Sequence, residues 1–250
     1  MSQREEIIAR AKALPQLPAS VNEALAVLQD PNANMEALAK VIEYDPGLTA
    51  TLLRLANSSY FAAVSTISSV REAVVRMGAN RVFQLLMASA VTPYVKPAVL
   101  GYGLEKGVLL DHCIAVAISS ELVAKELKIA PPPHTFTSGL LINIGKIVLG
   151  EYLEIDPTPI ITLAHEELIS FEEAEKQVLG INHVELGSLL LEHWQLPQEI
   201  VEVVRWHHNP EFFEQQNLTL DLVHVGDTVA KMVGIGIGYD GLHYHPSPVV

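Results

Sequence analysis

Several features that would place this chain in a familiar class are missing from it. It has a single cysteine, Cys113, which excludes an intramolecular disulfide and a cysteine-based zinc site. It also lacks a run of about 18 apolar residues, because the best candidate, residues 82–100, is broken by two prolines, a glutamine and a lysine. The polar N-terminus shows no signal-peptide pattern. We therefore expect a cytoplasmic protein that does not span a membrane.

Positive charge is scarce as well. The chain has 16 Lys and Arg residues against 29 Asp and Glu residues, for a net charge of −13. The basic residues are scattered and are not interleaved with aromatic ones, so we do not expect nucleic acid as a ligand. The phosphate-binding motif G-x-x-x-x-G-K-[S/T] is absent, as are the G-x-S-x-G and H-E-x-x-H motifs of two hydrolase classes. The glycine-rich stretch at 234–241 fits G-x-G-x-x-G, but it follows an expected helix and not a strand, so it does not indicate a dinucleotide-binding turn.

Helical periodicity dominates what is present. Apolar residues make up 49% of the chain, and they recur every three to four positions along most of it, which predicts an all-α fold. Residues 158–163 are the only weak candidate for a strand. The helices are expected at residues 4–14, 20–28, 34–42, 46–55, 69–77, 81–90, 105–127, 134–151, 170–179, 183–194, 198–207 and 218–233.

Turn-forming residues divide this helical pattern. Residues 92–103 hold two prolines and two glycines, which indicates a connector between two subdomains. The division predicted from the sequence is therefore an N-terminal helical subdomain at 1–96 and a helical core at 97–235. The tail at 236–250, with its glycines, histidines and prolines, is expected to be irregular or mobile.

The segment Gly139–Lys146 is the most informative one. It reads G-L-L-I-N-I-G-K and is similar to the metal-site segment G-L-L-H-D-I-G-K, in which an adjacent His-Asp pair supplies ligands to a catalytic metal. Here those two positions are Ile142 and Asn143. Isoleucine has no lone pair, and an amide oxygen is a weaker ligand than a carboxylate.

Further motifs occur in a fixed order along the chain. They are L-P-x-L-P at 14–18, D-P-G-L-T at 45–49, L-R-L-A-N-S-S-Y-F at 53–61, G-x-x-H-x-E-x-G at 180–187, L-P-x-x-I at 196–200 and W-H-H at 206–208. Together with the Gly139–Lys146 segment they resemble the HDOD domain, a bacterial signalling relative of the HD-type phosphohydrolases. The resemblance covers about residues 10 to 235, and its most specific part is the block at 53–61.

This resemblance implies a degenerate HD-like helical core with an N-terminal helical subdomain. In catalytic HD proteins, a helix His, an adjacent His-Asp pair and a distal Asp surround one or two divalent metals. The positions that correspond are His112 for the first His, Ile142 and Asn143 for the pair, and Asp227 for the distal Asp; His183 and either His207 or His208 correspond to the extra histidines of two-metal versions. Of the four core ligands, His112 and Asp227 would survive.

The resemblance and the lost pair favour a non-catalytic signal-transduction module that acts through contacts with other signalling proteins. We expect no catalytic residue and no cofactor, with a divalent metal bound at most adventitiously. The alternative is a residual metal-dependent phosphohydrolase that acts on a nucleotide or a cyclic dinucleotide. Sensing of a small ligand in the vacated pocket would overlap with the first interpretation. The sequence does not indicate an oligomeric state.

Several of these residues also have a structural interpretation. His112 and Asp227 could serve as buried hydrogen-bonding groups. Adjacent residues point about 100° apart on a helix, so we expect one of His207 and His208 to face the site and the other to cap a helix end. The polar residues Arg54, Asn57, Ser58 and Ser59 form a candidate interaction surface, or they tie the loop before Ile67 to the helices.

Overall fold

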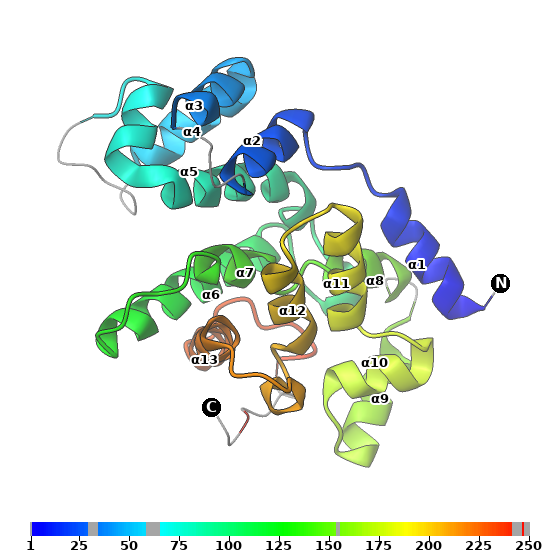
Figure 1. Ribbon diagram of the computed structural model, residues 1–250. Helices are drawn as coiled ribbons and strands as arrows, with labels where there is room; N and C mark the ends of the chain where they lie inside the picture. The colour runs from blue at the N-terminus through cyan, green and yellow to red at the C-terminus, as the bar shows by residue number, and fades with distance from the viewer. Residues whose placement is uncertain (1, 30–34, 59–65, 154–155, 242–246, 248–250) are drawn as a thin grey trace. The chain divides into compact units, whose positions relative to one another are not determined.

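A computed structural model of the protein describes residues 2–29, 35–58, 66–153, 156–241 and 247 (Figure 1). These residues form α-helices and two short 3-10 helices, and the one β-pairing found among them is an isolated bridge between Val99 and Leu104. The all-α fold predicted from the sequence is confirmed. Every helix in the described part of the chain is too short or too polar to cross a membrane.

The chain divides into two compact units. The first, residues 16–93, contains α2 (Ala19–Gln29), α3 (Met35–Glu43), α4 (Pro46–Ala56) and most of α5 (Val70–Val95). Asp45 caps α4 by accepting a hydrogen bond from the Leu48 N–H at 3.0 Å, and Pro46 occupies the first turn. Gly78 interrupts α5 with a φ of 78°, so α5 consists of two helical stretches, as the sequence pattern predicts.

The second unit, residues 1–15 and 94–250, carries the candidate site. It contains α1 (Gln3–Ala13), η1 (Leu100–Tyr102), α6 (Val108–Glu126), α7 (Thr135–Leu141), α8 (Lys146–Leu153), α9 (Thr158–Glu167), α10 (Phe171–Leu179), α11 (His183–His193), α12 (Gln198–Trp206), η2 (Pro210–Phe212) and α13 (Leu218–Met232). Helix α6 packs against α13 and α7, and α11 packs against α12.

Helix α1 lies in the second unit, although the sequence-based division assigns residues 1–96 to one subdomain. Its apolar residues Ile7 and Ala11 are buried, and the helix packs on α8 and α11. Arg4 also reaches Glu185 of α11 with an Nη2–Oε1 distance of 2.6 Å. These contacts, formed far apart in sequence, explain why α1 joins the C-terminal half of the chain.

Two local predictions are wrong. Residues 158–163, the weak strand candidate, begin helix α9, which buries Ile160 and Ala164 one turn apart. The helix expected at 134–151 is two helices, α7 and α8, separated by a turn at residues 142–145. The turn is fixed by Gly145, where a Cβ atom would lie only 2.0 Å from the carbonyl oxygen of His183.

The C-terminal tail is irregular in its described part, but it is held in the core. Asp240 is buried, and its Oδ2 lies 2.5 Å from the Nζ of Lys146, which is also buried. Burial alone would raise the pKa of Asp240, but the charge of Lys146 holds it below its usual range. The described part of the tail is therefore irregular, as expected, and is anchored at Asp240, whereas residues 242–246 and 248–250 lie outside the described part.

Candidate functional site

Helices α6 and α13 bring the first His and the distal Asp of the motif together. The two helices approach closely at Gly226, where a Cβ atom would lie 2.9 Å from the backbone nitrogen of Ser120. This approach places the His112 Nε2 3.0 Å from the Oδ1 of Asp227, and both side chains are buried. The pair therefore meets as the sequence predicts.

The His112–Asp227 pair is already satisfied by the protein. The Nδ1 of His112 lies 2.8 Å from the carbonyl oxygen of Ile235, so both ring nitrogens face acceptors. The second carboxylate oxygen of Asp227 accepts from the Nζ of Lys231 at 2.7 Å, one helical turn away. Burial alone would raise the pKa of Asp227, but Lys231 and the hydrogen bond from His112 hold it well below its usual range.

The degenerate pair lies in the turn between α7 and α8. Ile142 is fully buried in an apolar cluster with Val116, Val203 and Val223. Asn143 is also fully buried, and neither its amide nitrogen nor its amide oxygen has a hydrogen-bond partner in the described part of the chain. Cys113, the residue after His112, is also buried, and burial raises the pKa of its thiol to about 12. The thiol makes a hydrogen bond with the Asn143 backbone.

A two-metal centre of the HD type does not fit these residues. Such a centre needs a bridging carboxylate at position 143 and an imidazole at position 142, and the chain supplies a neutral amide and an aliphatic side chain instead. Asp227 is the one carboxylate left in the motif, and Lys231 already neutralises its charge. Of the four motif positions, His112 and Asp227 thus form a hydrogen-bonded pair, while Ile142 and Asn143 are a buried apolar residue and a buried neutral amide.

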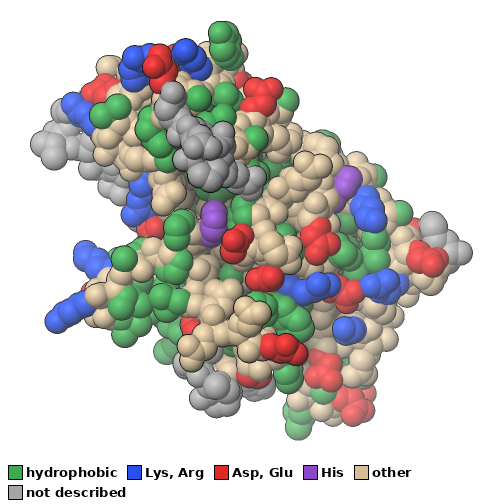
Figure 2. All heavy atoms as spheres, in the orientation of Figure 1, with side chains coloured by type: hydrophobic (Ala, Val, Ile, Leu, Met, Phe, Trp, Pro, Cys, Tyr) green, Lys and Arg blue, Asp and Glu red, His purple; other side chains and the backbone are tan. Residues whose placement is uncertain are grey.

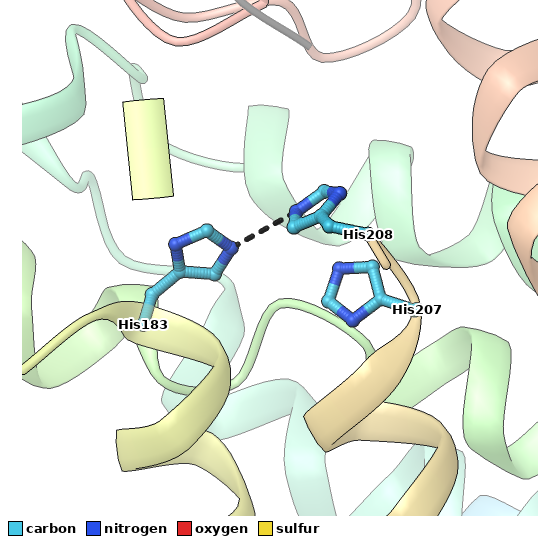
Figure 3. A group of neighbouring side chains, drawn as sticks. All are labelled: His183, His207 and His208. Atoms are coloured by element: carbon cyan, nitrogen blue, oxygen red, sulfur yellow. Dashed lines mark hydrogen bonds between the residues drawn. The ribbon is translucent and has the colours of Figure 1, made fainter. Parts of the chain in front are cut away.

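Three other histidines form a separate cluster, here called the histidine triad: His183, His207 and His208. Each offers one ring nitrogen, and these three atoms lie within 4.8 Å of one another (Figure 3). His183 is the first residue of α11, which Asn182 caps by accepting from the Glu185 N–H at 3.0 Å. His207 and His208 follow α12 directly.

The prediction for the two adjacent histidines holds in part. His207 is the C-cap of α12, and its Nδ1 lies 2.8 Å from the carbonyl oxygen of Val204, so one histidine does cap a helix end. Both rings nevertheless point into the triad, so the expectation that only one of them faces the site is wrong. Helix α12 ends at Trp206, and His208 lies in the turn beyond it. The separation of about 100° holds only inside a regular helix. Outside it the two rings can share one side, and their centroids are 3.9 Å apart.

Neighbouring groups fix how the triad presents its nitrogens. The Nδ1 of His183 lies 2.8 Å from the Oε2 of Glu175, and the Nδ1 of His207 lies 2.8 Å from the carbonyl oxygen of Val204. Tyr102 donates its hydroxyl to the other oxygen of Glu175 at 2.5 Å. Burial lowers the pKa of all three histidines well below their usual value. They are therefore neutral, and His207 carries its proton on Nδ1, because the carbonyl oxygen of Val204 can only accept.

The sequence did not single out Glu175, Lys231 or Tyr102 as parts of the site. The four-residue spacing between Asp227 and Lys231 on one helix could have indicated their ion pair. No local signal points to Glu175, because it reaches His183 from the preceding helix, α10. Burial raises the pKa of Glu175 to about 8, although the hydrogen bonds from Tyr102 and the His183 backbone oppose that shift.

The residues of the candidate interaction surface in the first unit differ in their contacts and exposure. The Nδ2 of Asn57 donates to the carbonyl oxygens of Leu53 and Ile67 at 2.8 and 2.9 Å, and its Oδ1 accepts from the Ile67 N–H at 2.8 Å. Arg54 is exposed and makes no hydrogen bond or ion pair with the residues that the structure describes. Ser58 is half-buried, and Ser59 lies outside the described residues.

The surface also has an open pocket of about 600 Å³ next to the triad. Its lining includes Glu172 of α10, Asn182 before α11, and Arg205 and Trp206 of α12, but none of the triad's own side chains. On the face drawn in Figure 2, Lys and Arg side chains are interspersed with Asp and Glu side chains. The charges on that face are thus mixed.

Comparison with known proteins places these features in a family. A model of the HDOD domain family matches residues 14–210. The chain is similar to an HDOD domain protein of unknown function from Geobacter sulfurreducens, with 25% identity, a TM-score of 0.77, and coverage of 98% of this chain and 80% of that one. A candidate phosphohydrolase of Shewanella amazonensis gives 26% identity and a TM-score of 0.71, with coverage of 90% and 79%.

Two more relatives extend the comparison. A candidate signal-transduction protein of Marinobacter aquaeolei gives 25% identity and a TM-score of 0.72, over 94% of this chain and 56% of that one. An uncharacterized protein of Treponema pallidum is 25% identical over 200 residues, which cover 78% of this chain. The match spans 38% of the length of that relative.

Proposed function

The chain belongs to the HDOD domain family, and on that basis we propose that it is a non-catalytic cytoplasmic regulator. It would act in signal transduction through contacts with other proteins and not through nucleic acid. The observation that carries this proposal is the state of the motif core. Ile142 is an apolar core residue, Asn143 is a neutral amide, and the one remaining carboxylate, Asp227, is paired with His112 and Lys231.

Phosphoester hydrolysis by an HD-type site depends on charge that this core lacks. The metal must polarise a phosphoryl oxygen and lower the pKa of a bound water, and for this it needs a geometrically complete shell with carboxylate ligands. To bind a metal, Asp227 would have to exchange its contacts with His112 and Lys231 for the ion. Without a His-Asp pair, the ion would gain too few ligands to offset the loss of those contacts.

The second candidate is a residual metal-dependent phosphohydrolase that acts on a nucleotide or cyclic dinucleotide. It is favoured by the three buried histidines next to Asp227, since the His208 Nδ1 lies 4.0 Å from the Asp227 Oδ2. The Shewanella relative, described as a candidate phosphohydrolase, points the same way.

An activity screen separates the two. The purified protein is incubated with linear and cyclic dinucleotides and with aryl phosphoesters, in the presence of Mg²⁺, Mn²⁺ or Zn²⁺. We expect hydrolysis no faster than that of a matched His112→Gln variant. Turnover that disappears in both His112→Gln and Asp227→Asn would establish the second candidate instead.

The protein-contact part of the proposal has its own test at Arg54. A partner captured from the source cell by the wild-type protein is re-assayed with two variants. Arg54→Glu should weaken capture and leave the melting temperature unchanged, because Arg54 is exposed. Asn57→Ala should lower stability by about 1–2 kcal/mol, because it removes three hydrogen bonds to the backbone. Unchanged capture by Arg54→Glu would place the interface elsewhere.

A further inference from the structure

Helix α6 carries apolar side chains on the side that faces away from the core. Its buried residues, such as Val116 and Ser120, lie on one side of the helix. On the opposite side, Ile114 and Leu122 are 37% and 50% exposed, and Ile118, halfway between them, is partly exposed. Residues four apart lie on the same face of a helix, so these three side chains form one continuous apolar row.

This apolar row calls for a second partner of the helix. A surface helix is normally polar on its exposed face, whereas a helix that is apolar on both sides is buried between two partners. In the second unit, α6 packs against α13 and α7, and these contacts leave the row uncovered. Figure 2 shows hydrophobic side chains gathered on the viewed face where Figure 1 draws α6. An exposed apolar patch bordered by charged residues is typical of a protein–protein contact.

Opposite charges lie at the two ends of the row. Asp111 precedes Ile114 by about one turn, and Lys125 follows Leu122 by about one turn. Both residues are exposed, and neither side chain makes a hydrogen bond or an ion pair with the residues that the structure describes. The two charges are therefore available to a partner.

The arrangement is complementary to a second copy of itself. Asp111 and Lys125 lie equally far from Ile118, about two helical turns on either side. If a second α6 lies antiparallel across Ile118, each Asp111 meets the partner's Lys125, and Ile114 packs against the partner's Leu122. A parallel pairing would bring like charges together, which opposes association.

We propose that the protein forms a two-fold symmetric dimer through antiparallel pairing of α6 with α6 of a second copy. Both ion pairs form in such a contact, and the apolar row is removed from water. This interface does not depend on the proposed function, because it requires neither a signalling partner nor a metal ion.

The charges at the ends of α6 also have an explanation within one chain. An acidic residue in the first turn and a basic residue in the last turn stabilise a helix by complementing its dipole. That effect would not change the mass of the particle in solution, and it does not account for the apolar row. Exchange of the two charges separates the explanations.

The first measurement is sedimentation equilibrium of the full chain over an about 100-fold range of concentration. We expect a dimer with twice the 27.3 kDa of one chain at the upper end of that range. Ile118→Glu should raise the dissociation constant by about 100-fold or more, because it places two carboxylates together on the symmetry axis. Val75→Glu changes a more exposed apolar residue on α5 and should leave the constant unchanged.

The second measurement exchanges the charges. Asp111→Lys and Lys125→Asp should each weaken the dimer by about 10-fold, because each brings like charges together. The two substitutions combined should restore the dimer while losing the dipole stabilisation, so the melting temperature stays below that of the wild type. Lys12→Asp, in the last turn of α1, is the matched control and should leave the dissociation constant unchanged.

A cross-link tests the register without relying on charge. The thiols of Ile118→Cys meet on the symmetry axis, so oxidation with copper phenanthroline should join two chains by a disulfide, while the natural Cys113 is buried. Leu122→Cys should cross-link much less, because it faces the partner's Ile114. A monomeric wild type, a dimer that Ile118→Glu does not weaken, or a combined charge variant as weak as the single ones would each overturn the proposal.

Discussion

The buried polar centre of the second unit has two halves, and the side chains in them differ in how fully the protein pairs them. In the half built on His112 and Asp227, the protein itself pairs both carboxylate oxygens, with an imidazole and with an ammonium group. In the half built on the histidine triad, the Nδ1 atoms of His183 and His207 contact the Glu175 carboxyl group and a backbone carbonyl oxygen. The Nε2 of His207 has no hydrogen-bond partner in the described part of the chain. The second unit thus buries both a paired carboxylate and a set of neutral imidazoles that is not fully paired among the described residues.

The difference shows that losing a metal motif does not remove every donor from a site. The positions that would carry charge have been neutralised by Ile142, Asn143 and Lys231, whereas the neutral imidazoles remain. Because a buried uncompensated charge costs far more than a buried neutral imidazole, the charged half needed internal partners.

The largest effect should come from Gly145→Ala, because Gly145 packs against the backbone of α11, the helix that carries His183. The added Cβ would lie 2.0 Å from the His183 carbonyl oxygen and 2.7 Å from the Gly187 nitrogen, and both neighbours are backbone atoms. We expect a loss of about 3 kcal/mol or more in the free energy of unfolding, measured by urea denaturation.

The control is Gly47→Ala in the first unit, where the nearest atom is the Asp45 Oδ1 at 3.4 Å. That variant should stay close to wild-type stability. If Gly145→Ala is as stable as this control, the close packing of the turn against α11 is not what positions the triad.

The free energy of unfolding should also fall by about 3 kcal/mol in Lys231→Met, which changes the half built on His112 and Asp227. The variant removes the ammonium group that pairs with the buried Asp227 carboxylate, and breaking a buried ion pair leaves an uncompensated charge. Chemical denaturation measures the loss, and the exposed Lys12→Met serves as the control. Adding Asp227→Asn to Lys231→Met should recover part of the loss; a strictly additive double variant would argue against the pairing.

The third prediction concerns pH, because the two halves respond to it differently. In chelator-treated protein, the three triad histidines have pKa values well below the 6.5 of the unfolded chain, so unfolding takes up protons as the pH falls below about 6.5. The free energy of unfolding should therefore fall with pH in that range. Glu175 opposes this, because its pKa is raised from 4.5 to about 8 and the folded state holds its proton more tightly.

The net uptake is then up to about two protons, and each proton corresponds to about 1.4 kcal/mol per pH unit. Thermal unfolding between about pH 7 and pH 5.5 measures it. His207→Gln should reduce the slope. Stability that stays constant or rises on acidification would contradict the assignment of neutral buried histidines.

The smallest effect is expected at Asn143. Its buried amide has no hydrogen-bond partner in the described part of the chain, so Asn143→Leu should stabilise the protein by about 1–2 kcal/mol. Gln84→Met is the contrast, since the Gln84 Oε1 accepts from Arg81 at 2.7 Å and its loss should destabilise. A destabilised Asn143→Leu variant would mean that a bound water or ion uses the amide.

Local signals in the sequence were sufficient for most of the fold. The Asp45 cap, Pro46 in the first turn and the break at Gly78 act within a few residues, so the pattern predicts their outcome. The errors arise where distant contacts decide. The turn at 142–145 depends on the approach of Gly145 to α11, and α1 joins the C-terminal half because Ile7 and Ala11 are buried there.

The site could be predicted only in part. The order of the motifs identified His112 and Asp227 as site residues, and in the structure they form a hydrogen-bonded pair. The convergence of His207 and His208 depends on α12 ending at Trp206 with His207 as its C-cap. The sequence predicted that end to within one residue, but not that both rings would turn to the same side. Glu175 contacts His183 from a different helix, which no local spacing reveals.

The pair formed by Lys146 and Asp240 bears on where this module can be cut from a longer polypeptide. The family match stops at residue 210, before α13 and before Asp240. A piece trimmed to that limit would lack the helix that covers α6 and the carboxylate that balances a buried ammonium group. We therefore expect a folding piece of the second unit to extend at least to residue 240, because a cut upstream of that point would separate Lys146 from the carboxylate that balances its charge.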